Sequence, residues 1–207
     1  MGISITVGLQ KGGVAKSTTA IFLGLAAHRD TGGRVLIVDA DPRSQTAYTW
    51  KGFAEDEWPE GVVVIPWPTL DVDRSVRAVA QDYEHIIIDT GGDNPEILAR
   101  SLRATRSLLM PLAPNAAEYT RAAATVELAR GVAATWNPDL TYKVAFVRTG
   151  GGQDADVRRM RLFFDEHGVP YAETRIRQRK MYSRAFGTSV PDLGEYADLY
   201  KELATEE

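Results

Sequence analysis

The chain begins with an apolar run, a glycine-containing turn and a helix-forming segment, which together read ISITVGLQKGGVAKSTT at residues 3–19. Residues 3–9 are rich in β-branched side chains and form a continuous apolar run, as in a strand covered on both faces of a parallel sheet. A strand, a glycine turn and a helix in this order direct several backbone N–H groups and a helix N-terminus at one point, where a phosphate-sized anion can bind. The segment therefore predicts a phosphate-binding loop after the first strand.

The side chains of this loop have separate expected roles. Lys16 can reach the β- and γ-phosphates of a nucleotide, and the Ser17 hydroxyl can ligate Mg²⁺. The common pattern G-x-x-x-x-G-K-[ST] has glycine where this chain has Gln10 and Ala15. If the turn needs a positive φ at Ala15, an alanine there costs roughly 1 kcal/mol. The expected nucleotide-binding residues are Lys11, Gly12, Gly13, Val14, Ala15, Lys16, Ser17 and Thr18.

The rest of the chain alternates between short apolar runs and helical patterns. Further strands are expected at residues 34–39, 62–66, 85–89, 108–112 and 143–147, and helices at 17–29, 73–81, 95–104, 116–134 and 155–167. This alternation predicts one α/β domain over residues 1–207, a doubly wound, mostly parallel sheet with helices on both faces. Residues 51–61 are expected to be a mobile loop, and 178–203 a helical stretch broken at 187–191.

Two of the expected strands end in carboxylates. One leads into Asp39-Ala40-Asp41-Pro42 and another into Asp89-Thr90-Gly91-Gly92. In an open parallel sheet, ligands bind beyond the carboxyl ends of the strands. Asp89 is therefore expected near Mg²⁺, through a water, and Asp41 is well placed to polarise an attacking water. The expected metal-binding residues are Ser17, Asp41 and Asp89, and the expected catalytic residues are Lys11, Lys16 and Asp41.

Composition excludes several classes of protein. The 207 residues include no cysteine, which rules out a disulfide scaffold, a thiolate zinc site and a cysteine-held iron–sulfur cluster. The sequence has neither a secretory signal pattern nor an apolar stretch of about 18 residues, so a cytoplasmic location is expected. The formal net charge is −4, so any binding to nucleic acid requires a local basic patch.

One basic cluster stands out late in the chain. It consists of Arg175, Arg177, Arg179, Lys180 and Arg184, with few acidic neighbours in sequence before Asp192. On an exposed surface, such a cluster is expected to bind the phosphate backbone of DNA without reading bases. The alternative is a solvated face neutralised by salt bridges. Arg158, Arg159 and Arg161 form a second, smaller cluster.

In order and spacing, residues 11–17, 39–42 and 88–92 resemble the ParA/MinD superfamily of deviant Walker ATPases. The chain length and residues 174–182 are similar to those of small plasmid-partition ParA proteins of the ParF type. This resemblance implies that Lys11 reaches across a nucleotide-sandwich dimer to the partner's γ-phosphate. It also implies phosphate and Mg²⁺ roles for Lys16 and Ser17, a water-positioning role for Asp41 and a Walker B role for Asp89.

The resemblance further implies what the protein binds. ATP and Mg²⁺ are the expected ligands, and a homodimer, non-specific DNA and a ParB-like centromere-binding protein are the expected partners. The expected activity is ATP hydrolysis in the cytoplasm at the nucleoid. Ala15 and the Thr90-Gly91-Gly92 segment depart from the family pattern, so hydrolysis is expected to be slow.

Other functions on the same scaffold remain open. A MinD-like membrane ATPase would end in a basic amphipathic helix, whereas residues 192–207 are acidic, so no membrane partner is expected. The apolar residues of this tail are better explained by a helix that docks on the protein itself. A small-molecule ligase would need a polar pocket beside the γ-phosphate, for which Asp93, Asn94 and Glu118 are candidates. A switch that positions another cargo is the third alternative, and Arg148 is a candidate neighbour of a purine base.

Overall fold

The computed structural model describes residues 2–10, 13–115 and 117–205 and contains a six-stranded sheet. All paired strands are parallel, and their spatial order is β3-β2-β4-β1-β5-β6. The strands are β1 (Ser4–Val7), β2 (Val35–Ala40), β3 (Val62–Pro66), β4 (His85–Thr90), β5 (Ser107–Leu112) and β6 (Thr141–Phe146). The predicted doubly wound α/β fold is therefore confirmed.

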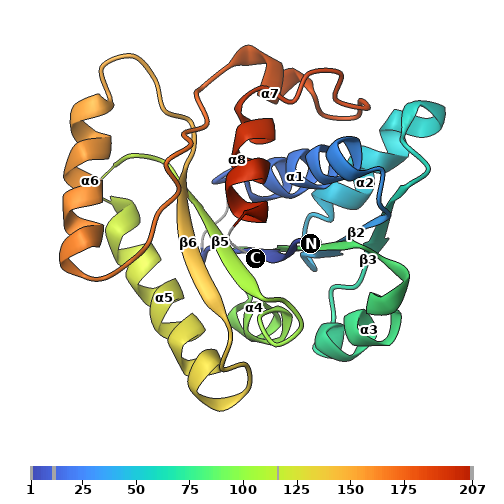
Figure 1. Cartoon of the computed structure of the whole chain (residues 1–207), viewed down its shortest axis with the longest axis horizontal. Coiled ribbons are helices and arrows are strands. Elements are labelled where there is room, and N and C mark those ends of the chain that lie inside the picture. The colour runs from blue at the N-terminus through green and yellow to red at the C-terminus, as the bar shows by residue number, and fades with distance from the viewer. Residues whose placement is uncertain (1, 11–12, 116, 206–207) are drawn as a thin grey trace.

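Helices cover both faces of the sheet (Figure 1). One face carries α1 (Lys16–Thr31), α2 (Thr46–Ala54), the short α7 (Lys180–Arg184) and α8 (Glu195–Ala204). The other carries α3 (Val72–Val79), α4 (Pro95–Ser101) and α5 (Ala117–Thr135), and α6 (Asp154–Glu166) packs beside α5 near the β6 edge. Two 3₁₀ turns follow α2 and α3, at Glu55–Glu57 and Ala80–Asp82.

The central strands β2 and β4 carry runs of consecutive apolar residues because each contributes to two cores. Val35 and Ile37 of β2 join the core beneath α1, while Leu36 and Val38 join the core beneath α3 and α4. Successive side chains of a strand point to opposite faces, so both faces need apolar residues when both are covered.

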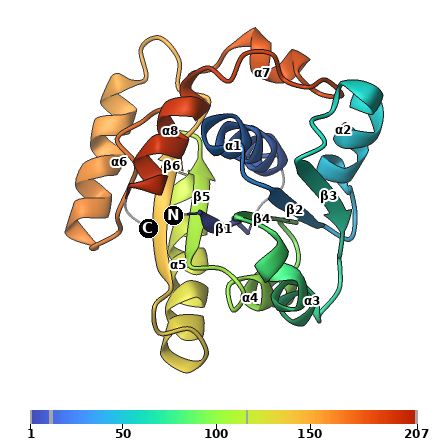
Figure 2. The same ribbon diagram turned by 45° about the vertical axis from the view of Figure 1, so that its right-hand side comes forward.

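The C-terminal helix docks on the helix that follows the phosphate loop (Figure 2). Tyr196, Leu199, Tyr200 and Leu203 of α8 are buried in the same core as residues of α1. The expected docking helix is thus confirmed. No helix within the described ranges is long and apolar enough to cross a membrane.

Two expectations about local structure were wrong. Much of the loop expected at residues 51–61 is the end of α2 and a 3₁₀ turn, because Ala47, Trp50 and Ala54 form a buried helical stripe. The stretch at 178–203 contains only the short α7 and α8. Residues 185–194 between them are irregular and run toward α2, where the ring of Phe186 lies 5.5 Å from that of Trp50.

The strand order brings the carboxyl ends of β2, β4 and β1 together. Asp39 of β2 is in register with Asp89 of β4, and Asp89 is in register with Val7 at the end of β1. The phosphate loop leaves β1 at this point. Segments far apart in sequence therefore meet at one edge of the sheet, where ligands of open parallel sheets bind.

Candidate nucleotide site

The phosphate loop turns sharply into α1. Gly13 has a φ of 76° and Ala15 a φ of 63°, both in the left-handed region. The turn therefore does need a positive φ at Ala15, the condition under which the sequence indicated a cost for alanine. Thr19 N donates to Ala15 O at 2.8 Å as the first turn of α1 closes. Left-handed residues directly before a helix N-terminus are typical of backbone anion sites. Lys11 and Gly12 lie outside the described residues.

Lys16 is the first residue of α1 and is only 7% exposed. Burial lowers the pKa of its amine, and the carboxylates of Asp89, Asp41 and Asp93 act in the opposite direction. The structure thus brings the predicted lysine together with both predicted aspartates. These carboxylates stabilise the charged form of a lysine whose burial disfavours that form.

Asp89 is buried at the end of β4, with 1% of the residue exposed. Burial and the neighbouring Asp39 raise its pKa to about 8, while Ser17 and Lys16 act in the opposite direction. Among the described residues, neither carboxylate oxygen has a hydrogen-bond partner of regular geometry. A buried carboxylate without partners is costly unless a cation or donor compensates it.

This arrangement fits Mg²⁺. The Ser17 hydroxyl and the Asp89 carboxylate supply the hard oxygen ligands that Mg²⁺ prefers. In the part of the chain that is described, no three acidic, histidine or cysteine side chains gather into a complete metal cage. Mg²⁺ usually keeps several waters and binds through one or two protein ligands plus phosphates, so two such groups suffice.

Asp39 and Asp41, which look alike in sequence, do different things. Asp39 is fully buried and accepts hydrogen bonds from Asp41 N at 3.2 Å and Tyr48 N at 3.0 Å. It therefore anchors the loop between β2 and α2. Asp41 is half-buried, and its oxygens accept from Arg43 N at 2.9 Å and the Ser44 hydroxyl at 2.7 Å.

A small hollow of about 170 Å³ lies beside Asp41, lined by the loops that follow β2 and β4. Arg43 and Asp93 form an ion pair across it at 2.6 Å. A Cβ at Gly91 would lie 2.8 Å from an oxygen of Asp41, so glycine permits the two loops to approach. Asn94 caps α4 by accepting from Ile97 N at 3.1 Å, which is a structural role for this residue.

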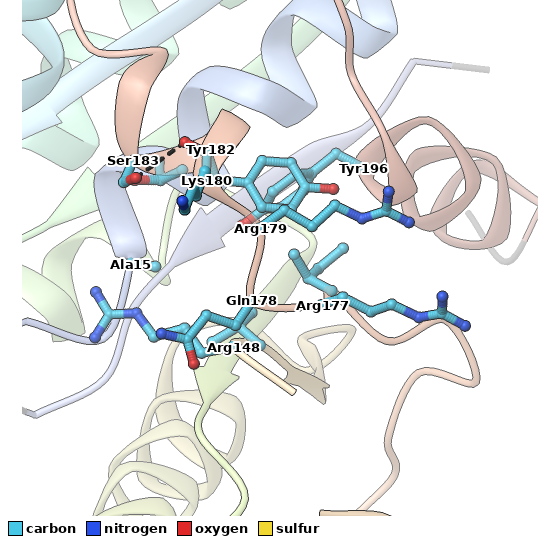
Figure 3. Close-up of a pocket in the computed structure, with 12 residues that line it drawn as sticks. Ala15, Arg148, Arg177, Gln178, Arg179, Lys180, Tyr182, Ser183 and Tyr196 are labelled. Carbon is cyan, nitrogen blue, oxygen red and sulfur yellow. Dashed lines mark hydrogen bonds between the residues drawn. The ribbon is translucent and has the colours of Figure 1, made fainter. Parts of the chain in front are cut away.

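A larger cavity of about 580 Å³ opens next to the start of α1 (Figure 3). Its volume lies in the range of small-molecule sites. It is lined by Ala15 and Thr18 of the loop and α1, Val147 and Arg148 after β6, Ile176 to Lys180, Tyr182, Ser183, and Tyr196 of α8. Arg148, the candidate neighbour of a purine base, is one of the residues that line this cavity.

The late basic cluster is divided by the fold. Arg177, Arg179 and Lys180 line the cavity, and Arg184 is exposed at the end of α7. The expectation of few acidic neighbours was wrong in space, because α6 and α8 each bring a carboxylate to it. Arg175 pairs with Asp154 at 2.7 Å, and Arg179 pairs with Glu195.

The second basic cluster is also divided. Arg161 turns inward to pair with Glu173 at 2.9 Å, whereas Arg158 and Arg159 are exposed. Glu118, the ligase candidate, is 1% exposed and pairs with Arg121 at 3.3 Å. Salt bridges across elements depend on packing, so the sequence pattern alone did not reveal them.

Sequence reasoning missed the aromatic residues that join the cavity to α1. The hydroxyls of Thr19 and Tyr196 lie 3.0 Å apart, and the ring of Phe22 lies 4.8 Å from that of Tyr196 and 5.2 Å from that of Tyr182. The apolar stripe of α8 indicated docking, but nothing in the sequence indicated the surface on which it docks.

Ala15→Gly is expected to raise the free energy of unfolding by about 1 kcal/mol and the melting temperature by roughly 2–4 °C, because glycine adopts a positive φ without steric strain. Thermal denaturation followed by circular dichroism would measure the change. The control is Ala123→Gly at an exposed position of α5, where glycine is expected to destabilise the helix. A melting temperature of Ala15→Gly at or below that of the wild type would contradict the strain at this loop.

Asp89→Asn is expected to change how stability depends on pH. Asp89 has a pKa of about 8 in the folded chain and near 4 when unfolded, so the folded state binds the proton more tightly between these values. As the pH rises from about 4 to about 8, the melting temperature of the wild type should therefore fall relative to that of Asp89→Asn. The expected fall is roughly 3 °C per pH unit.

Melting curves between these pH limits, without nucleotide and with a chelator, test this expectation. Asp139→Asn, an exposed position, is the matched control and should follow the wild type. Parallel curves for Asp89→Asn and the wild type would show that Asp89 does not hold a proton in the folded chain.

Comparison with known proteins agrees with this geometry. Residues 5–193 match the family model described as the CobQ/CobB/MinD/ParA nucleotide binding domain. Protein ParA of Rhizobium radiobacter is 26% identical over 186 residues, which cover 88% of this chain and 81% of that protein. The maintenance of carboxysome distribution protein A of Halothiobacillus neapolitanus is 25% identical over 194 residues, 92% of this chain and 88% of that protein.

Among solved structures, the cobyrinic acid a,c-diamide synthase of Mycobacterium smegmatis with bound ADP and magnesium superposes with a TM-score of 0.77. It is 19% identical, and the match covers 100% of this chain and 95% of that one, so it shows a shared fold. The family match spans most of the chain and includes every strand apart from the first residue of β1. The chain therefore belongs to the CobQ/CobB/MinD/ParA family of nucleotide-binding domains.

Proposed function

We propose that this chain is a ParA-type ATPase that binds ATP with Mg²⁺ and hydrolyses it slowly as a timing switch. The observation that carries the proposal is the buried carboxyl group of Asp89, which has no hydrogen-bond partner of regular geometry among the described residues and lies next to Lys16 and Ser17 at the left-handed turn of the phosphate loop. The negative charge of a triphosphate complements Lys16, and its bound Mg²⁺ would replace the proton that Asp89 otherwise holds below its pKa of about 8.

Each residue has a role in phosphoryl transfer to water. The backbone of the loop and Lys16 would bind the β- and γ-phosphates. Ser17 and Asp89 would hold Mg²⁺, which neutralises charge on the phosphate oxygens when bound. Asp41 lines the small hollow on the γ-phosphate side and would orient the attacking water. The Asp41 oxygens accept from Arg43 N and the Ser44 hydroxyl, which fixes the carboxylate and leaves lone pairs for that water.

The proposed cycle requires two copies of the chain. Lys11 would cross to the partner's γ-phosphate and close an ATP sandwich dimer. The dimer would bind DNA non-specifically through the exposed cations Arg177, Lys180 and Arg184. A ParB-like partner would stimulate hydrolysis and release, and so segregate plasmid or chromosomal DNA in the cytoplasm. Similarity to Protein ParA supports this cycle.

Positioning of another cargo is the second candidate. The carboxysome distribution protein is as similar to this chain as Protein ParA is, and both matches cover most of the chain. The ATP site and the DNA surface would be shared, and only the partner would differ. A small-molecule ligase is less favoured, because Asp93, Asn94 and Glu118 are all engaged in contacts within the protein.

Lys16→Ala is expected to abolish ATP binding or turnover, because it removes the buried cation at the phosphates. Lys11→Ala should bind ATP nearly as the wild type does but should not dimerise with it. Calorimetry would measure binding, phosphate release would measure turnover, and light scattering would measure mass. Lys51→Ala, at an exposed position of α2, is the control. ATP-dependent dimers of Lys11→Ala would overturn the sandwich.

Retention of non-specific DNA with ATP, compared with ADP, tests the partition function itself. Arg177→Glu is expected to lower DNA affinity about tenfold near physiological salt and to flatten the dependence of log K on log salt by about 0.9 for each phosphate that the variant no longer neutralises. Arg74→Glu makes the same charge change on α3, on the opposite face of the sheet, and should have little effect. An unchanged slope for Arg177→Glu would show that DNA binds at a surface that does not include Arg177.

A further inference from the structure

The segment from Arg175 to Arg184, here called the strap, faces two ways. Its first part is extended, with a bridge between Arg177 and Thr149, and α7 follows. In Figure 3, Arg177 and Arg179 extend to one side of the strap, while Gln178 and Lys180 lie on the side of Ala15. This alternation is the expected geometry of an extended chain. The strap therefore links the large cavity with an outer basic surface.

The carboxylate of Glu195 pairs with Arg179, one of the cations of that outer surface. Glu195, the first residue of α8, accepts from Arg179 Nε at 2.8 Å and also from Arg179 Nη2. It accepts from the Tyr182 hydroxyl as well, and Glu195 N donates to the Tyr182 oxygen at 3.0 Å. These three residues, Arg179, Tyr182 and Glu195, are here called the Glu195 latch.

The latch is closely fitted. Gly194 has a φ of 51°, and a Cβ there would lie 2.4 Å from the Tyr182 hydroxyl, so only glycine allows this contact. Burial opposes ionisation of Glu195, but the hydrogen bonds from Tyr182 and Arg179 hold its pKa below the usual value. The carboxylate is therefore charged at neutral pH and neutralises Arg179. Glu195 itself is shielded, because its side chain is only 15% exposed.

Two members of the latch also line the cavity. Arg179 and Tyr182 line it together with Thr18 and Tyr196, and the Tyr182 ring packs 5.2 Å from that of Phe22 on α1. A molecule in the cavity can therefore contact two members of the latch. A ligand shifts a conformational equilibrium by its difference in affinity for the two states. Arg179 is the more exposed partner of the ion pair, with 46% of its side chain exposed against 15% for Glu195, so a ligand has access to the pair from the Arg179 side.

We propose that the Glu195 latch sets the number of cations that the strap offers to the phosphate backbone of DNA, and that a nucleotide in the cavity opens it. When the latch is closed, Glu195 neutralises Arg179. When it is open, Arg179 joins Arg177 on the outer side, and guanidinium groups bind phosphate with two parallel hydrogen bonds. This inference rests on the proposed function and adds a means by which one site regulates the other.

Glu195→Gln tests the latch without nucleotide, where ATP-driven dimerisation does not contribute. It should bind a random DNA duplex about threefold more tightly at low salt, with a slope of log K against log salt steeper by about 0.9, as expected when one more phosphate is neutralised. Asp198→Asn removes the same charge from an exposed position on α8 and is the matched control. It should keep the wild-type slope.

Arg179→Gln separates the latch from a general charge effect. Combined with Glu195→Gln, it removes both charges of the latch, so nucleotide-free DNA binding should match that of the wild type, and the slope measured with an ATP analogue should be flatter than that of the wild type. The double variant should therefore lose the gain of Glu195→Gln. If Glu195→Gln does not fold, Tyr182→Phe removes both hydrogen bonds between the Tyr182 hydroxyl and Glu195 and should shift the slope in the same direction.

The outcomes distinguish this inference from the function on which it rests. Retention of DNA by the wild type with ATP, combined with a wild-type slope in Glu195→Gln and Tyr182→Phe, overturns the latch alone. Failure of the wild type to retain DNA in any nucleotide state overturns the partition function. Gain of DNA binding by Glu195→Gln under that second result would still support the latch.

Discussion

The burial of Asp89 among like and opposite charges is the constraint around which this site is organised. Strand order places Asp89 beside Asp39, and α1 brings Lys16 to the same point. Asp39 accepts hydrogen bonds from two backbone N–H groups, whereas the oxygens of Asp89 have no such partner in the described part of the chain and are open to a ligand. A single buried carboxyl group with a pKa of about 8 thus connects the parallel sheet to the chemistry proposed for it.

The second organising feature is the attachment of the C-terminal region to α1. Tyr196 of α8 reaches Thr19 of α1, and the strap crosses above them to complete the large cavity. The two ends of the chain therefore build one site. Because α1 begins at the phosphate loop, a ligand bound at the loop lies close to the strap, and both border the same cavity. This proximity gives the proposed coupling between nucleotide and DNA a short physical route.

Much of the fold was predictable because its signals are local. The apolar runs of β2 and β4, the turn before α1 and the stripe on α8 each reflect a short-range rule of periodicity or turn chemistry. The residues of α2 were misread because Lys51 and Pro59 suggested a loop, while the buried stripe through Trp50 decided the structure. Tertiary burial overrides local composition in such cases.

The sequence by itself determined the family, the parallel α/β fold and the place of Lys16, Ser17, Asp41 and Asp89 at strand or helix ends. These conclusions needed only the order and spacing of residues. Only the tertiary structure decided which charges are available. It paired Arg179 with Glu195 and Arg175 with Asp154, and it left both carboxylate oxygens of Asp89 without a hydrogen-bond partner of regular geometry within the described ranges. Charge pairing and desolvation depend on distances between segments that are remote in sequence, and these distances exist only after the chain has folded.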